Sequence, residues 1–185
     1  RRGFRDERGN LFFEVTRFAK LLRPSYIFLE NVPGLLSHGG GDTFETILST
    51  LDALGYNVEW QVLNSSHFGV PQNRERIIII GSLKQPFVFS RLVKQTRKPL
   101  VDFLDESGDF EYLDPSEYTL LEETHQTQAG LIFAGYRNKA IRKAGVRPGT
   151  EHLSRVHKQP NRIYSIYGTH PTLPSQESSG RFFVL

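Results

Sequence analysis

The chain has 185 residues, of which 38% are hydrophobic and 23% charged, with a net charge of +3 and neither cysteine nor methionine. These values are typical of a globular protein with one domain and a small second lobe, and no apolar run approaches the roughly 20 residues that span a bilayer. Without cysteine a disulfide framework and a thiolate metal site are excluded, and without a secretory signal we expect a cytoplasmic location.

The first hundred residues alternate helical and extended patterns. Residues 10–22 carry apolar side chains at helical spacing with Asn10 as N-cap, and a second capped helix is predicted from Asp42 to Gly55. Three segments have strand patterns, namely 26–31, 57–64 and 76–81. Strands separated by single helices are typical of βαβ units, so we predict an α/β fold with a mostly parallel sheet.

The pattern changes after Lys84, and we predict a domain boundary near Ser90. Between Pro99 and Glu123 there are nine Asp or Glu and no Lys or Arg, whereas Gly130 to Arg162 contains eight Lys or Arg and one acid. A concentrated basic stretch is expected of a protein that binds a polyanion. A solvated polar face explains the charge alone equally well.

Glu30 lies where the first predicted strand ends. Ligands of open parallel sheets bind at the carboxyl ends of strands, so this carboxylate is a candidate site residue. Near apolar walls it would hold or share a proton, which suits hydrogen bonding to a substrate nitrogen or general acid chemistry. Alternatively Glu30 caps the loop or pairs with a structural arginine, and spacing alone leaves both hypotheses open.

Two arginines precede the last strand in "GVPQNRERIIIIG". Alternation along an extended chain places Arg74 and Arg76 on one face, with Gln72 on the same side. Paired guanidinium groups suit a phosphate, a carboxylate or a base oxygen, because their fork matches planar acceptors. The alternative is a charged strand edge that prevents aggregation, with Glu75 pointing outward.

A third polar segment is "RIYSIYGTHPTLPSQESSGRFF". Its hydroxyl groups, backbone N–H groups and Arg181 are typical phosphate-positioning groups. The six histidines show no metal-ligand spacing, so no metal is predicted. The glycine run "SHGGGD" lacks the Lys-Ser/Thr of a phosphate loop and is interpreted as a flexible loop.

Taken in order, "RGNLFFEVTRFAKLLRPSYIFLENVPGLL", "VLNSSHFGVPQNRERIIIIG" and "RIYSIYGTHPTLPSQESSGRFF" resemble three motif regions of the DNA (cytosine-5)-methyltransferases. The resemblance implies part of a class I S-adenosylmethionine-dependent methyltransferase (Rossmann-like) sheet with a smaller, mostly irregular target-recognition lobe. We accordingly predict the C-terminal half of the catalytic domain at 1–90, the DNA-reading lobe at 91–165, and a segment returning to the catalytic domain at 166–185.

The resemblance also implies a chemistry for individual residues. Such an enzyme flips a cytosine out of double-stranded DNA and methylates its C5 after a cysteine thiolate adds to C6. By resemblance Glu30 holds the N3 and amino edge of the base, Arg76 binds the base oxygen and orients Glu30, and Arg74 lies near the nucleotide backbone or the nucleophile. Arg8 resembles the arginine of the mobile catalytic loop, and Leu11 the residue lining the adenine pocket of S-adenosylmethionine.

Asn31 would hold the active-site loop in place. The residues that we predict to contact DNA are Arg8, Gln72, Arg137, Lys139, Arg142, Lys143, Arg155, Lys158 and Arg162. Duplex DNA is the expected partner, with no membrane and no metal. A bacterial, nucleoid-associated enzyme of a restriction-modification system is the predicted context.

The chain departs from the family pattern in several places. It has no cysteine, and the family's Pro-Cys motif is expected shortly before Arg1; the glycine-rich cofactor motif, the ribose-binding acid and the final helix are also missing. Neither Ser66 nor His67 replaces an activated cysteine. We therefore expect an inactive piece of a longer or split enzyme, whose missing N-terminal part is a partner. The alternatives are a catalytically inactive DNA-binding or regulatory relative, and an enzyme acting on tRNA cytosine.

Overall fold

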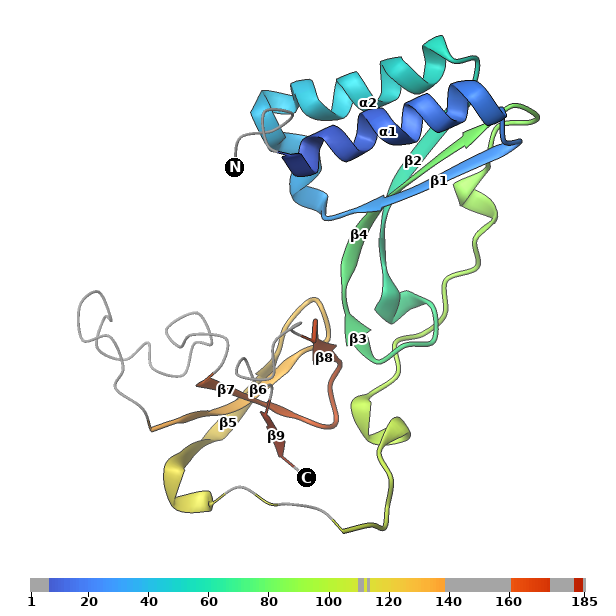
Figure 1. Cartoon of the computed structure of the whole chain (residues 1–185). Coiled ribbons are helices and arrows are strands. Elements are labelled where there is room, and N and C mark those ends of the chain that lie inside the picture. The colour runs from blue at the N-terminus through green and yellow to red at the C-terminus, as the bar shows by residue number, and fades with distance from the viewer. Residues whose placement is uncertain (1–6, 110–111, 113, 139–160, 174–181, 185) are drawn as a thin grey trace. The chain divides into compact units, whose positions relative to one another are not determined.

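The computed structural model describes residues 7–109, 112, 114–138, 161–173 and 182–184. The chain divides into two compact units (Figure 1). Unit 1 comprises Arg1–Asn64 and Glu75–Lys94, and unit 2 comprises Ser65–Arg74 and Gln95–Leu185. A loop from the first half of the chain therefore belongs to the second unit.

The sheet of unit 1 has three strands, β1 (Tyr26–Asn31), β2 (Asn57–Asn64) and β4 (Glu75–Ser82). β4 lies between the other two and is antiparallel to both. The predicted strands are confirmed, but the prediction of mostly parallel pairing is wrong for them. The connection from β2 to β4 contains no crossover helix, so the chain returns antiparallel, whereas β1 and β2 are joined through a helix and run in the same direction.

Two helices, α1 (Glu7–Leu22) and α2 (Asp42–Ala53), lie together beside this sheet (Figure 1). α1 begins before Asn10, so Asn10 lies inside the helix and is not its N-cap. The N-cap of α2 is Gly41, which makes no side-chain hydrogen bond, and Asp42 is the first helical residue. Its negative charge is favourable there because the N-terminus of a helix carries partial positive charge.

The segment between β1 and α2 forms the 3-10 helix η2 (Pro33–Gly41). His38, Gly39 and Gly40 interrupt it with non-helical backbone angles, and Gly39 and Gly40 have positive φ angles of 63° and 74°. Glycine adopts these angles without a steric penalty, which explains the glycine run at this position.

The core of unit 1 lies between the two helices and one face of the sheet. Ile77 and Ile79 of β4 are fully buried there, together with Leu51 of α2. The other buried members are Ala19, Ile27, Leu35, Phe44, Ile47 and Tyr56. Because side chains alternate along a strand, Arg76, Ile78 and Ile80 point to the opposite face.

Unit 2 contains a four-stranded sheet in the order β5 (Tyr118–Gln126), β6 (Ile132–Arg137), β7 (Arg162–Ser165) and β9 (Phe182–Val184). The pairs are antiparallel except for β7 and β9, which are parallel. A separate short pair joins β3 (Gln72–Asn73) and β8 (His170–Pro171) in parallel. The short 3-10 helices of the chain are η3 (Ser65–His67), η4 (Phe89–Arg91), η5 (Leu100–Phe103) and η6 (Pro115–Glu117).

The core of unit 2 includes Phe133, Ile163 and Tyr164 from neighbouring strands. Gly135 of β6 lies against β5, where a Cβ atom would collide with the carbonyl oxygen of Thr119. The close approach of these two strands therefore requires glycine. Within the described part of the chain, the helices are too short or too polar to cross a membrane.

We expect Leu51→Ala to lower the free energy of unfolding by about 2–5 kcal/mol, because it removes a fully buried side chain and leaves a cavity. Leu22→Ala is the matched control, since the side chain of Leu22 is 69% exposed, and its effect should stay below about 0.5 kcal/mol. Urea unfolding followed by circular dichroism measures both values. Equal losses for the two variants would contradict the assigned core.

Candidate functional site

The clearest polar contact in unit 1 joins Glu30 of β1 to Arg76 of β4. Glu30 lies directly opposite Ile78, so Arg76, two residues before Ile78, is its diagonal neighbour on the same face of the sheet. The Arg76 Nε atom lies 2.6 Å from the Glu30 Oε1 atom. The Arg76 Nη1 atom also donates a hydrogen bond of 2.7 Å to the carbonyl oxygen of Glu75. The register of the strands thus sets the geometry of the pair.

This pair lies on the sheet face opposite the helices and is open to solvent. The Glu30 side chain is 44% exposed and that of Arg76 is 21% exposed. Phe28, on the same face of β1, is also exposed, while Ile78 is half-buried. The expected apolar walls around Glu30 are therefore not formed by the described residues. The contact fits both earlier hypotheses, a structural ion pair and a reactive carboxylate oriented by an arginine.

The chain turns directly after Glu30. The Asn31 Oδ1 atom accepts a hydrogen bond of 2.8 Å from the backbone N–H of Val32. The N–H of Leu35, which is buried, donates to the carbonyl oxygen of Val32 at 3.0 Å. The Asn31 side chain is thus bonded to the next residue, and its role in holding the active-site loop stays a prediction.

Gln72 and Arg74 belong to unit 2, whereas Arg76 belongs to unit 1. Arg74 falls between the end of β3 and the start of β4, so the alternation expected from Gln72 to Arg76 is interrupted. The carbonyl oxygens of Arg74 and Gln72 accept hydrogen bonds from the backbone N–H and the hydroxyl of Ser65, at 3.0 and 2.6 Å. These bonds close the loop on itself.

The same loop is bonded to the third motif segment. The N–H of His170 donates to the carbonyl oxygen of Pro71 at 2.7 Å, and the hydroxyl of Thr172 donates to that of Asn73 at 2.9 Å. Two motif segments that lie about a hundred residues apart in the sequence are therefore in contact within unit 2.

The predicted DNA-binding cations have different surroundings. Arg137 forms an ion pair with Glu117, with 2.5 Å between the Nη2 and Oε2 atoms, and the hydrogen bond to this carboxylate raises the pKa of Arg137. Glu117 thus neutralises part of its charge, and the DNA contact of Arg137 stays a prediction. Arg162 is half-buried on β7 opposite Tyr136. Five further predicted residues lie outside the described part of the chain: Lys139, Arg142, Lys143, Arg155 and Lys158.

Two cations that the sequence analysis did not single out, Arg97 and Lys98, line a pocket in unit 2. The cluster "KQTRK", with three cations in five residues, is the signal that marks them. No three His, Asp or Glu side chains converge on a possible metal position anywhere in the ranges that the structure describes.

The chain belongs to the C-5 cytosine-specific DNA methylase family, whose model matches residues 1–178. This finding confirms the resemblance that the three motif segments indicate.

Particular relatives are consistent with this assignment. The type II methyltransferase M.NlaIV of Neisseria lactamica is 52% identical over 115 residues, which are 58% of this chain and 27% of that protein. The orphan methyltransferase M.Rho11sI of Bacillus phage rho11s is 32% identical over 214 residues, covering 97% of this chain and 42% of the phage protein. The chain thus spans less than half the length of these two relatives.

A solved structure shares the fold. It is the crystal structure of an E. coli protein encoded within a prophage and described as a DNA modification methyltransferase. The similarity covers 92% of this chain and 59% of the other, with a TM-score of 0.52 and 19% sequence identity. The α/β methyltransferase fold class predicted from the sequence is therefore confirmed.

We also compared the described residues with the needs of S-adenosylmethionine. Leu11 is exposed on α1 and offers an apolar surface to an adenine ring. The ribose and the amino-acid end of this cofactor need hydrogen-bonding groups, and the described neighbours of Leu11 on α1 include the exposed apolar residue Phe13 and the ion pair of Glu14 with Arg17. The described residues therefore do not amount to a site for S-adenosylmethionine.

A double-mutant cycle tests the pair. Glu30→Gln and Arg76→Gln, alone and combined, should give a coupling free energy of about 0.5–1 kcal/mol, because the carboxylate is 44% exposed and solvent weakens the attraction. The pair of Glu14 and Arg17 on α1, with both side chains more than half exposed, is the control and should give about 0.3 kcal/mol. Denaturant unfolding measures all four variants of each pair, and zero coupling between Glu30 and Arg76 would contradict the observed contact.

Proposed function

We propose that this chain is part of a DNA (cytosine-5)-methyltransferase that transfers a methyl group from S-adenosylmethionine to C5 of a flipped-out cytosine in a specific duplex sequence. The observation that carries the proposal is the ion pair of Glu30 with Arg76 at the end of a strand, in a member of the cytosine-specific methylase family. M.NlaIV is named a type II methyltransferase, which supports a role in restriction-modification. Bacterial relatives also support a cytoplasmic enzyme associated with the nucleoid.

In this proposal Glu30 recognises the edge of the flipped cytosine. Its carboxylate is accessible, and Arg76 fixes one of its oxygens, so its orientation is set before a base arrives. Hydrogen bonding to N3 and the amino group, strengthened as N3 gains a proton, makes C6 more electrophilic. Arg76 would contact the base oxygen, and Arg74 would lie near the nucleotide backbone or the nucleophile.

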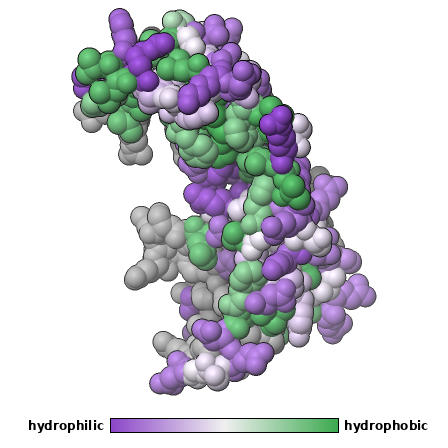
Figure 2. All heavy atoms as spheres, turned by 90° about the vertical axis from the view of Figure 1, so that its right-hand side faces the viewer, coloured by the Kyte–Doolittle hydropathy of each residue, from purple (hydrophilic) through white to green (hydrophobic). Residues whose placement is uncertain are grey.

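The nucleophile and the cofactor groups must come from another part of the protein. The chain contains no cysteine, and M.NlaIV is nearly four times as long as the segment that matches. Figure 2 shows apolar side chains reaching the surface of the unit that contains the two helices. Leu11 and Leu22 of α1 and Phe28 of β1 are exposed apolar residues of that unit. Such surface supports a further protein segment that packs there.

A second candidate is a catalytically inactive relative that binds DNA or regulates a partner methyltransferase. The lack of cysteine is the observation that favours it. Addition of the N-terminal part of a close relative, with its cysteine, separates the two hypotheses: the enzyme hypothesis expects methyl transfer to duplex DNA, and the regulatory one expects binding alone. A tRNA substrate in the same assay tests the third possibility.

In the complemented enzyme, we expect Glu30→Gln to lower the single-turnover methylation rate by about 10²-fold or more, with DNA affinity changed by less than about threefold. The amide keeps the shape of the side chain but cannot stabilise the protonated base as well. Glu59→Gln, an exposed carboxylate on the same sheet face, is the control and should leave the rate unchanged. Equal rates for Glu30→Gln and the wild type would refute the role of Glu30.

Arg142 and Arg137 should differ in their effect on DNA binding. Arg142→Gln should weaken binding and lower the slope of log affinity against log salt by about 0.9, the value for one phosphate contact. Arg137→Gln should change the slope much less, because Glu117 already neutralises that guanidinium. Fluorescence anisotropy across a salt series measures both. A salt-independent affinity of the wild type would contradict the DNA-binding proposal itself.

A further inference from the structure

Unit 2 contains a pocket of about 350 Å³ that no part of the proposed base-binding site uses. Three segments line it: Arg97 and Lys98, the turn between β5 and β6 around Gln128 and Gly130, and the loop at Tyr167 and Gly168. All three segments belong to the same unit, so the pocket is formed within one compact body.

Backbone hydrogen bonds hold the walls of the pocket together. The N–H of Thr169 donates to the carbonyl oxygen of Gly130 at 2.8 Å, and its hydroxyl donates to that of Ala129 at 3.0 Å. The N–H of Leu100 donates to the carbonyl oxygen of Gly168 at 2.9 Å. A Cβ atom at Gly168 would lie 2.7 Å from the Gly130 oxygen, so the contact requires glycine. The pocket therefore has a fixed shape.

The lining carries positive charge and an unsatisfied donor. The Arg97 Nη1 atom donates to the carbonyl oxygen of Gln128 at 2.6 Å, while the Arg97 Nε atom is buried and has no hydrogen-bond partner. The Lys98 Nζ atom lies 5.8 Å from the centre of the Phe103 ring, and Lys98 is exposed. None of the residues that line the pocket is acidic. An anion in the pocket would therefore meet two cations and no carboxylate among the residues that line it.

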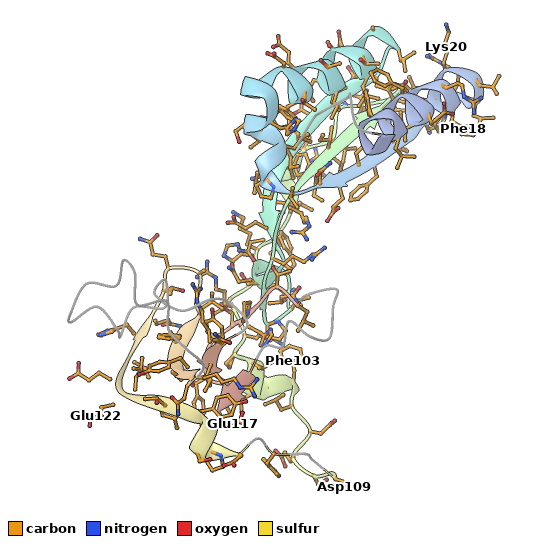
Figure 3. The ribbon with its side chains drawn as sticks, turned by 60° about the vertical axis from the view of Figure 1, so that its left-hand side comes forward. Phe18, Lys20, Phe103, Asp109, Glu117 and Glu122 are labelled. Carbon is orange, nitrogen blue, oxygen red and sulfur yellow. The ribbon has the colours of Figure 1, made fainter. Side chains whose placement is uncertain are left out.

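Two acidic residues of the same unit, Glu117 and Glu122, do not contact these cations. Glu117 is paired with Arg137. Figure 3 shows Glu122 on the opposite side of this unit from Phe103, the ring that Lys98 contacts. The residues that line the pocket therefore contribute two cations and no carboxylate.

We propose that this pocket binds a phosphate group of the DNA backbone, with Arg97 and Lys98 as its cationic ligands and the exposed Tyr167 beside them. The proposal rests on the proposed function, because the same duplex would supply the phosphate. A guanidinium and an ammonium group that line one pocket match the acceptors of a phosphodiester, and such contacts fix register without reading sequence. The exposed side chains of Gln126 and Gln128 at the rim leave room for a polymer that continues past the pocket.

Lys98→Gln is the decisive variant. The Lys98 side chain makes no hydrogen bond with the described residues and is exposed, so the fold should persist without it. With the full chain and a fluorescein-labelled duplex, we expect its salt slope to fall by about 0.9 and its affinity at low salt to fall several-fold, for every duplex sequence. Lys94→Gln removes the same charge from an exposed residue that does not line the pocket, and should change the slope by less. Arg97→Lys keeps the positive charge but loses the paired N–H donors of the guanidinium. It should weaken DNA binding with little change in the slope of log affinity against log salt.

The wild type and the variants report on different proposals. If the wild type binds no duplex, the proposed function fails and the DNA pocket fails with it. If the wild type binds with a steep salt dependence while Lys98→Gln and Lys94→Gln behave alike, only the pocket is overturned. The pocket proposal would also be overturned if Lys98→Gln changed the salt slope of tRNA binding but not that of duplex DNA binding. Circular dichroism of each variant shows that a weaker complex does not result from unfolding.

Discussion

The candidate site depends on the position of β4 between β1 and β2. Its backbone is hydrogen-bonded to both neighbours, and Ile77 and Ile79 are buried under the helices. Because strand side chains alternate, this burial forces Arg76 to the opposite face, where the register with β1 makes it the diagonal neighbour of Glu30. A slip of one residue would turn Arg76 into the core. The hydrophobic effect on one face of the sheet thus orients the charged pair on the other.

The elements of unit 1 were predictable because their patterns are local. "YIFLEN" and "RIIIIG" became β1 and most of β4, and the helix from Asp42 was also found. The direction of pairing was not predictable, since periodicity says which face a residue occupies and nothing about the neighbouring strand. The assignment of Gln72 and Arg76 to different units was not predictable either, because the chain passes into unit 2 after Asn64 and returns at Glu75 without any change of composition.

Tertiary contacts also decide which cations are available. Arg137 looked equivalent to the other basic residues of its stretch, yet Glu117, twenty residues earlier, is folded against it through the pairing of β5 with β6. Arg97 and Lys98 directly precede an acidic stretch, and the sequence analysis did not single them out. In the structure they face a pocket without carboxylates. The charge that a polyanion meets therefore depends on how the unit folds, and the net charge of a sequence segment does not predict it.

The exposed apolar residues of α1 offer a surface on which a further segment of the enzyme could pack. Helical spacing predicted that the apolar side chains of residues 10–22 would pack on the sheet. Of Leu11, Phe12, Val15, Phe18, Ala19 and Leu22 only Ala19 is buried, and Figure 3 shows Phe18 projecting from the helix. The apolar face of α1 is wider than the area that the sheet of unit 1 covers. Such a wide apolar face is expected when a helix packs against two partners. The open face around Glu30 and the lack of cysteine have the same explanation in our proposal. In that proposal Glu30 and Arg76 would hold the base, and the segment that covers α1 would belong to the part of the enzyme that attacks it.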